Sequence, residues 1–307
     1  MKSPRSLSRR EFLISALAAA VGVHPALAAE KAAADPIIDI HQHTNYGGSR
    51  DPVTLLQNGP ARSDAALLAH QRTMGVTQTI LLPAGRPLRR GSTLEGRANG
   101  LQGTVSGNDH VLALARQYPG EFVFGANEVS DLDDAPAVIK KYLDLGACVI
   151  GEQKFGVECD SPEMQKLYQL AASYRVPILM HWQVGSFNHG FERFHKMLEK
   201  YSQVNFIGHA QTWWANIDAA NENSPKNLYP KGLVKAGGLT DRYLRDYSNM
   251  FADLSAGSGE NAFKRDPEHA RGFFQRHQDK LLYGSDCNDA TGKAANCSGA
   301  RQIAQVR

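Results

Sequence analysis

Hydrophobic runs alternate with amphipathic stretches along the chain after Pro36. Short apolar runs are typical of buried parallel strands, and longer amphipathic stretches are typical of the helices that cover them. The predicted strands are 37–43, 76–83, 122–129, 147–155, 177–183, 204–210, 250–255 and 281–286. The predicted helices are 63–74, 108–118, 133–145, 161–174, 191–201, 239–247 and 266–277. This order predicts repeated strand–helix units around a parallel sheet.

Local signals support several of these boundaries and suggest the fold class. Ser161 followed by Pro162 is a good helix start, and Gly75 and Gly146 stand where helices should end. Eight strand–helix units in about 270 residues match the usual size of a (β/α)8 TIM barrel, an α/β fold. A doubly wound open sheet is the alternative, and the absence of a Gly-x-Gly-x-x-Gly turn after the first strand disfavours it.

The composition is that of an ordinary globular protein with a sizeable core. Of 307 residues, 42% are hydrophobic and 21% are charged, so we expect one large domain over 35–307. The formal net charge is +3, and residues 1–28 alone carry four basic side chains and one acidic side chain. The rest of the chain is therefore close to neutral, which gives no indication of nucleic acid as a partner.

The first residues have the pattern of a targeting segment. Ser8-Arg9-Arg10-Glu11-Phe12-Leu13 precedes an apolar stretch, 14–23, and Ala26-Leu27-Ala28 follows it. This pattern resembles a twin-arginine (Tat) signal peptide over 1–28, which implies the Tat export machinery as a partner and a periplasmic or secreted protein. An uncleaved anchor is the alternative, but the apolar stretch is shorter than the ~20 residues that a membrane span needs.

Polar side chains stand at the carboxyl ends of several predicted strands, where a (β/α)8 barrel has its active site. His41 and His43 share one face of the first strand because strand side chains alternate. The other strand ends contribute Glu152, Lys154, His181, His209 and Asp286. Packing is the simplest explanation for any one of these histidines. Several imidazoles and a carboxylate from separate strands together suit a divalent metal such as zinc.

Other residues are candidates for the substrate side of such a site: Arg86, Lys154, Trp182 and Trp213. Two of them lie in long connections, and long loops on the catalytic face commonly shape a pocket. Solvated arginines and packed tryptophans are the alternative. An arginine that faces inward would favour an acidic substrate. Glu152 and Lys154 lie on one strand face, so an internal ion pair is the alternative to the ligand role that we favour for Glu152.

The pattern as a whole resembles the amidohydrolase superfamily of metal-dependent barrel enzymes, and within it the amidohydrolase-related (amidohydrolase 2) branch, which includes decarboxylases. The resemblance rests on Asp39-Ile40-His41-Gln42-His43, on the strand-end histidines and on Tyr283-Gly284-Ser285-Asp286. It implies one or two divalent ions, Zn²⁺ first, bound by His41, His43, His181 and Asp286. It also implies that Glu152 is a ligand or supports one, and that His209 binds a second metal or holds the water or substrate.

The function that this resemblance implies is metal-dependent hydrolysis of an amide, ester or lactone bond in a small substrate. The metal would activate a water, and Asp286 would take its proton, with His209 as the second catalytic candidate. A non-oxidative decarboxylase of the same family is the alternative, and an inactive metal-retaining binding protein is the third hypothesis. The strand-end residues do not separate the first two.

The C-terminal region adds two expectations. Only 298–306 are available for the final helix, so we expect that helix to be short or truncated. Cys287 and Cys297 could form a disulfide within one loop, which export would permit. The sequence is compatible with a homo-oligomer and does not specify one.

Overall fold

The structure is a computed structural model, and it describes residues 35–47, 49–50, 57–58, 61–88, 100–101, 105–294 and 297–306. The predicted signal peptide, residues 1–28, lies outside these ranges. Among the described residues, we find no helix with the length and hydrophobicity that crossing a membrane requires.

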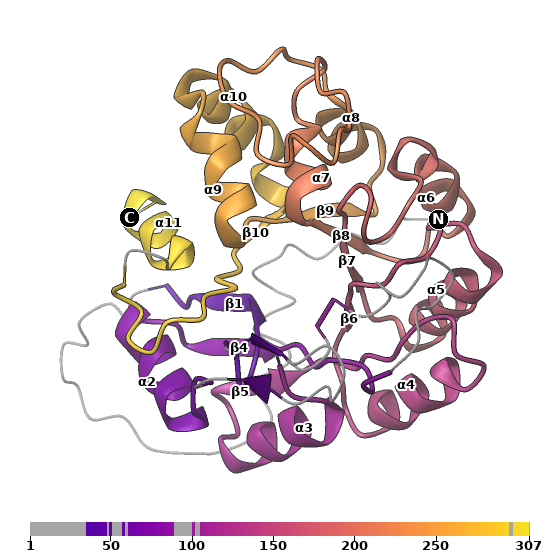
Figure 1. Ribbon diagram of the computed structural model, residues 1–307, viewed down its shortest axis with the longest axis vertical. Helices are drawn as coiled ribbons and strands as arrows, with labels where there is room; N and C mark the ends of the chain where they lie inside the picture. The colour runs from indigo at the N-terminus through magenta and orange to yellow at the C-terminus, as the bar shows by residue number, and fades with distance from the viewer. Residues whose placement is uncertain are drawn as a thin grey trace, which may run out of the picture. The chain divides into compact units, whose positions relative to one another are not determined.

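Eight short parallel strands, one for each predicted strand, form the centre of the compact unit Pro36–Arg307 (Figure 1). One sheet has the order β1 (Ile38–Gln42), β4 (Gln78–Leu81), β5 (Phe122–Phe124). The other has the order β10 (Leu281–Leu282), β9 (Met250–Asp253), β8 (Phe206–His209), β7 (Ile178–His181), β6 (Ile150–Gln153). A separate antiparallel pair, β2 (Ser49–Arg50) and β3 (Gln57–Asn58), was not predicted.

Backbone hydrogen bonds join the two sheets at both edges and close them into a ring. After β5, Ala126 forms a parallel bridge with Ile150 of β6. At the other edge, the Ile40 amide donates to the Tyr283 carbonyl at 3.0 Å. The predicted (β/α)8 barrel is therefore confirmed.

Helices follow the strands and surround the ring (Figure 1). Those close to the predicted bounds are α2 (Asp64–Met74), α3 (Asn108–Gln117), α4 (Ala135–Asp144), α5 (Pro162–Tyr174), α8 (Leu239–Asp246), α10 (Pro267–His277) and the short final α11 (Ser298–Val306). The Ser161 hydroxyl accepts from the Met164 amide at 3.3 Å and so caps α5. Gly75 ends α2 with a φ of 74°, a left-handed conformation that favours glycine.

Four helical regions differ from the prediction. α7 (Ala210–Ala215) and α9 (Ala256–Lys264) were not predicted. α7 begins directly after β8, and α9 begins after two residues that follow β9. α7 is too short to show a helical period, and two glycines near the start of α9 lower its helix propensity. The predicted helix 191–201 is a 3-10 turn, η1 (Phe191–Arg193), followed by α6 (His195–Lys200); a second 3-10 turn, η2 (Gln278–Lys280), precedes β10.

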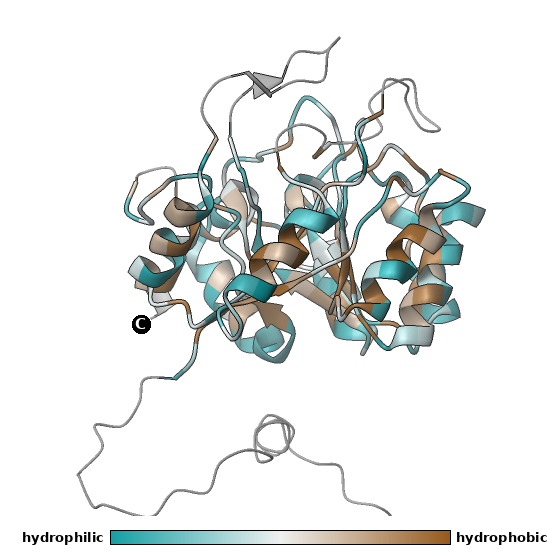
Figure 2. Ribbon diagram, turned by 90° about the horizontal axis from the view of Figure 1, so that it is seen from below, coloured by the Kyte–Doolittle hydropathy of each residue, from teal (hydrophilic) through white to brown (hydrophobic). Residues whose placement is uncertain are grey.

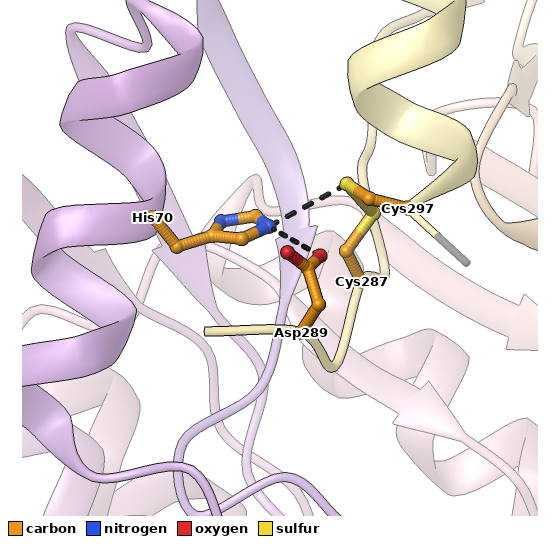
Figure 3. A group of neighbouring side chains, drawn as sticks. All are labelled: His70, Cys287, Asp289 and Cys297. Atoms are coloured by element: carbon orange, nitrogen blue, oxygen red, sulfur yellow. Dashed lines mark hydrogen bonds and ion pairs between the residues drawn. A yellow bond between two sulfur atoms is a disulfide. The ribbon is translucent and has the colours of Figure 1, made fainter. Parts of the chain in front are cut away.

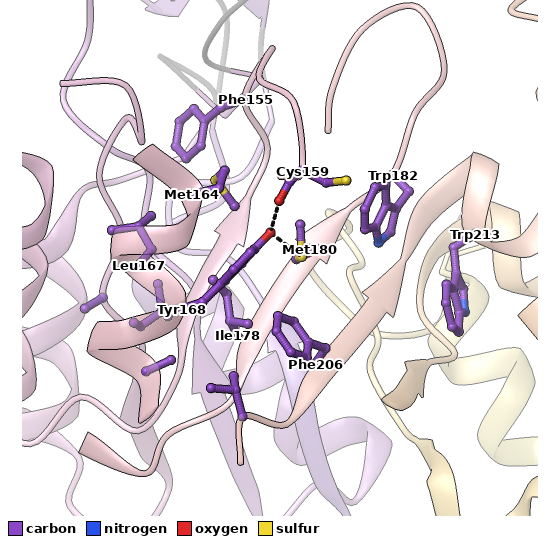
Figure 4. Packing of buried hydrophobic residues seen from close by; sticks show 14 of the residues in the cluster. Phe155, Cys159, Met164, Leu167, Tyr168, Ile178, Met180, Trp182, Phe206 and Trp213 are labelled. Atoms are coloured by element: carbon purple, nitrogen blue, oxygen red, sulfur yellow. Dashed lines mark hydrogen bonds between the residues drawn. The ribbon is translucent and has the colours of Figure 1, made fainter. Parts of the chain in front are cut away.

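The larger hydrophobic cluster lies outside the ring, between strands and helices. Tyr168 of α5 is fully buried there among aromatic and aliphatic side chains, and its hydroxyl donates to the Cys159 carbonyl at 2.7 Å (Figure 4). The outer helices mix hydrophobic and hydrophilic residues (Figure 2), because one face covers the strands and the other meets solvent. This layer holds the strands from outside.

A smaller cluster fills the inside of the ring and places the histidines above it. Leu179 of β7 and Ile207 of β8 belong to this inner cluster. His181 and His209 lie two residues further along the same strands, so they project from the same strand face. The barrel thus directs both imidazoles into the space at the carboxyl ends of its strands.

The two tryptophans predicted to bind substrate are fully buried in the outer layer. Trp182 follows His181, so strand alternation turns its ring to the opposite face, where it packs against Phe194 with ring centroids 4.8 Å apart. Trp213 lies on α7 against Gly208 of β8. The structure therefore assigns both side chains to packing rather than to a substrate surface.

The predicted disulfide between Cys287 and Cys297 is present, with Cα atoms 5.1 Å apart. It joins the loop after β10 to the start of α11. Cys148 and Cys159 are free.

Gly208 tests the packing that supports β8. A Cβ there would overlap the Trp213 ring, so we expect Gly208→Ala to lower the free energy of unfolding by about 1–3 kcal/mol, as overpacking does. The control is Gly257→Ala in α9, where a Cβ meets no atom within 4 Å. Urea unfolding compares the two variants, and equal losses of stability would contradict this account.

Candidate metal centre

The imidazoles of His41 and His43 meet at the carboxyl end of β1, and both are buried. The Nδ1 atom of His41 lies 2.6 Å from Asp253 Oδ2, and Nδ1 of His43 lies 2.8 Å from the Leu82 carbonyl oxygen. Each Nδ1 therefore donates a proton away from the pair. The two Nε2 atoms face each other at 3.1 Å.

Two carboxylates reach the same pair of nitrogens. Glu152 Oε2 lies 3.4 Å from Nε2 of His41 and 3.3 Å from Nε2 of His43. Asp286 Oδ1 lies 3.8 Å and 3.7 Å from the same two atoms, and this buried oxygen has no hydrogen-bond partner. Nitrogen and oxygen acceptors from three strand ends thus converge on one point. These residues fit a divalent cation, which would satisfy all four at once.

The charges of the cluster also favour positive charge at this point. Burial opposes a charge on His41, but nearby carboxylates, Asp286 first, outweigh burial and raise the pKa of His41 well above its usual 6.5. Burial likewise opposes a charge on Glu152, but Lys154 and His181 hold the pKa of that carboxyl well below its usual 4.5. A proton on His41 balances the ionised carboxylates, and a metal cation would do so in its place.

Glu152 connects the two pairs of histidines. Its Oε2 faces His41 and His43, whereas its Oε1 lies 2.5 Å from Nδ1 of His181 and 3.8 Å from Nε2 of His209. The predicted ligands therefore form two sets around one carboxylate, each with its ligand atoms within 4.8 Å: His41, His43 and Asp286, and Glu152, His181 and His209. Whether they hold one ion or two stays a prediction.

Asp253 of β9 supports the histidines from below, a role that the sequence did not reveal. Besides its bond to His41, its Oδ2 lies 3.3 Å from Nδ1 of His209. Burial would raise the pKa of Asp253, but His41 and His209 outweigh it and lower that pKa. Ser255 places its hydroxyl 3.0 Å from the same His209 nitrogen. Gly284 is required beside them, because a Cβ there would overlap the Asp253 carboxylate.

Tyr46, in the loop after β1, is a second residue that sequence reasoning missed. Its ring packs edge-on against His43 with centroids 5.1 Å apart. Burial, together with the negative charges of Asp286 and Glu152, raises the pKa of the Tyr46 hydroxyl well above its usual 10. The hydroxyl therefore keeps its proton and can donate a hydrogen bond toward Asp286.

Asp286 is held in place by the junction of the last and first strands. Its amide donates to the His41 carbonyl at 2.8 Å, and its φ of 45° is uncommon for any residue but glycine. Immediately before it, the Ser285 amide donates to the Asp39 carboxylate at 2.9 Å, and the His41 amide donates to the same oxygen at 3.0 Å. Asp39 thus fixes the spacing between the backbone at His41 and the backbone just before Asp286.

Arg86 and Lys154, the charged residues predicted for the substrate side, lie in different surroundings. Arg86 donates to Glu128 and to Asp134, both at 2.8 Å, and its side chain is 40% exposed. Because acidic neighbours already pair with it, Arg86 gives no support to an acidic substrate. Lys154 lies over the Phe187 ring, with its Nζ 5.8 Å from the centroid, and its charge acts on Glu152.

Comparison with solved structures identifies the same architecture elsewhere. The chain is similar to a probable 2-pyrone-4,6-dicarboxylic acid hydrolase from Acinetobacter baumannii, crystallised with citric acid, with a TM-score of 0.54 and 14% identity over 88% of this chain and 92% of that one. A 2,6-dihydroxybenzoate decarboxylase aligns with a TM-score of 0.47 and 13% identity, covering 88% and 99% of the two chains. No protein-family model and no curated protein matches the sequence. At these identities the likeness shows the fold alone.

His181 provides a test of the electrostatics of the centre. Burial, with a contribution from Lys154, lowers the pKa of His181 to about 4. In the unfolded chain the imidazole titrates near 6.5. Above that pH, neutral His181 makes its full contribution to the free energy of unfolding. As the pH falls toward 4 this contribution, about 3 kcal/mol, is lost because the unfolded chain binds the proton more readily. Unfolding of chelator-treated protein between pH 7 and 4 should show this loss. His181→Gln should show a shallower pH dependence than the wild type, and parallel curves for the two proteins would contradict the assignment.

Proposed function

We propose that this chain is a metal-dependent hydrolase of the amidohydrolase superfamily. The observation that carries the proposal is the convergence of the His41 and His43 Nε2 atoms with Glu152 Oε2 and the unpartnered Asp286 Oδ1. The site lies at the carboxyl ends of the barrel strands, where barrel enzymes carry their chemistry. The shared fold with the probable 2-pyrone-4,6-dicarboxylic acid hydrolase supports a hydrolytic member of this fold.

A divalent metal bound there supplies Lewis acidity, polarising a substrate carbonyl and making an attacking water more acidic. Asp286 has the geometry to move the proton. Its Oδ1 faces the two Nε2 atoms, while its Oδ2 lies 3.9 Å from Nε2 of His209. One oxygen can therefore serve as a ligand while the other accepts the proton of the water and returns it to the leaving group.

His209 is suited to hold the substrate or the attacking water, or to bind a second ion. Its Nδ1 is occupied by the Ser255 hydroxyl at 3.0 Å and by Asp253 at 3.3 Å. Its Nε2 is the nitrogen that faces Glu152 and Asp286. Bonds to Nδ1 fix the ring, so Nε2 is presented in one orientation.

Zinc is the ion that we propose, because imidazole and carboxylate ligands suit it. We also propose export through the Tat route, on the pattern of residues 1–28, to the periplasm or beyond. An oxidising compartment would maintain the disulfide between Cys287 and Cys297.

Metal analysis tests the centre directly. Purified protein should carry about one or two divalent ions per chain, and His41→Ala or Asp286→Ala should lose that metal because each removes a converging ligand. His195→Ala, a histidine on α6 outside the centre, is the matched control. Mass spectrometry of the metal, with circular dichroism to confirm folding, measures the outcome. Full activity in metal-free wild type would contradict the proposal.

A substrate panel separates hydrolysis from the alternative. Esters, amides and lactones, including 2-pyrone-4,6-dicarboxylate, should be cleaved with uptake of water, and aromatic carboxylates should release no carbon dioxide. Asp286→Asn should lower kcat by about 100-fold or more, because the proton acceptor is lost while the side-chain volume is kept. Carbon dioxide release without hydrolysis would assign a decarboxylase instead. If metal-loaded protein shows neither hydrolysis nor decarboxylation, a binding protein is favoured.

A further inference from the structure

A second group of metal-ligating side chains lies outside the proposed catalytic centre (Figure 3). His70 comes from α2, Cys287 and Asp289 from the loop after β10, and Cys297 from the start of α11. The ligand atoms of all four lie within 4.8 Å of one another, and all four residues are buried. The two cysteines form the disulfide described above.

The hydrogen bonds around His70 leave a lone pair directed into this group. Gln71 donates its amide protons to Asp39 at 2.8 Å and to Thr79 at 2.7 Å, so its Oε1 remains an acceptor. The His70 Nδ1, 2.8 Å from that oxygen, must therefore carry the proton. In the neutral imidazole, Nε2 is then the acceptor, and it lies 3.5 Å from the Cys297 sulfur.

Asp289 directs a second acceptor at the same point. Its Oδ1 is buried without a hydrogen-bond partner and lies 3.3 Å from Nε2 of His70. Its side chain is only 5% exposed, and its Oδ2 accepts from the backbone amides of Thr291 and Gly292 at 3.1 and 2.7 Å. The carboxylate is thus fixed, with one oxygen facing an imidazole lone pair and two sulfurs. Two acceptors that face each other in a buried space suit a cation placed between them.

We propose that His70, Asp289, Cys287 and Cys297 form a second metal site that the disulfide opens and closes. With the disulfide reduced, the two thiolates, the His70 Nε2 and the Asp289 Oδ1 bind one divalent cation of the zinc class. Two soft sulfur ligands, one imidazole and one carboxylate suit tetrahedral zinc. With the disulfide formed, the sulfurs are no longer thiolates and the site releases the cation.

Reduction of the disulfide between Cys287 and Cys297 to two thiols requires a reductant, and a dithiol balances the reaction. The reductant supplies two electrons and two protons, the S–S bond breaks, two S–H bonds form, and the reductant becomes a disulfide. Cation binding then displaces both thiol protons to solvent. In the reverse direction, a disulfide oxidant accepts two electrons from the thiolates, its own S–S bond breaks, and it takes two protons from solvent to become a dithiol. The S–S bond between Cys287 and Cys297 forms as the cation leaves.

Cobalt binding to the whole protein tests the proposal, because thiolate ligands give Co²⁺ a charge-transfer absorption that nitrogen and oxygen ligands do not. Protein reduced with a phosphine, which with water supplies the same two electrons and two protons, should show this absorption on titration with Co²⁺. The oxidised protein should not show it. The first centre contains no sulfur, so it does not contribute to the signal, and failure here would leave the proposed hydrolase unaffected.

Variants identify the ligands. Cys297→Ser should abolish the thiolate absorption or reduce it by about half, because it removes one sulfur ligand of the two. His70→Ala should weaken Co²⁺ binding at this site by at least about 100-fold, more than the effect typical of an outer-shell change. Cys159→Ser is the matched control, since Cys159 is buried elsewhere and free; its titration should match the wild type.

Three results would overturn the proposal. The first is reduced protein that keeps its near-UV circular dichroism and shows no thiolate absorption with Co²⁺. The second is an absorption that Cys297→Ser and His70→Ala leave unchanged. The third is reduced protein that unfolds even with Co²⁺ present, because the site requires the fold that brings α2 to the loop after β10.

Discussion

The junction between the first and last strands is the constraint on which the candidate metal centre depends. The buried carboxylate of Asp39 accepts hydrogen bonds from the backbone amides of both His41 and Ser285. The amide of Asp286 returns to the His41 carbonyl. These bonds set the distance between a candidate ligand on the first strand and one after the last strand, so the contacts that close the barrel here also position these two residues.

Around this junction, the candidate centre concentrates buried negative charge. Asp253 and Glu152 are fully buried carboxylates whose pKa values are lowered despite burial. Isolated buried charges are strongly unfavourable, and they are tolerated when a partner of opposite sign is close. His41 provides that partner when protonated, and a divalent ion would provide more charge at the same point. The arrangement would therefore favour a bound divalent cation electrostatically.

Much of the fold could be predicted because buried parallel strands have a distinctive pattern: the apolar runs that precede His41, His181 and His209 each form a strand that ends at or beside its histidine. The side-chain network could not be predicted in the same way. Asp253 ends a strand like many aspartates, and only its distance to His41 reveals its role. Trp182 and Trp213 were expected beside the substrate, Trp213 because it lies in a long connection. Strand alternation instead turns Trp182 into the outer layer, and Trp213 belongs to an unpredicted helix. Arg86 faces acidic neighbours that a linear sequence does not place beside it.

The pairing of Asp39 with Ser285 spans 246 positions of the chain, and this has a consequence for how the protein is made. A ribosome completes the first strand long before it reaches the last, so the edge of the first strand has no hydrogen-bonding partner from the last strand during that time. Contacts between such distant residues form slowly and leave unpaired edges exposed in the meantime. His41 and His43 can meet Asp286 only after the chain has emerged as far as position 286, so until then the nascent protein lacks the complete candidate metal centre.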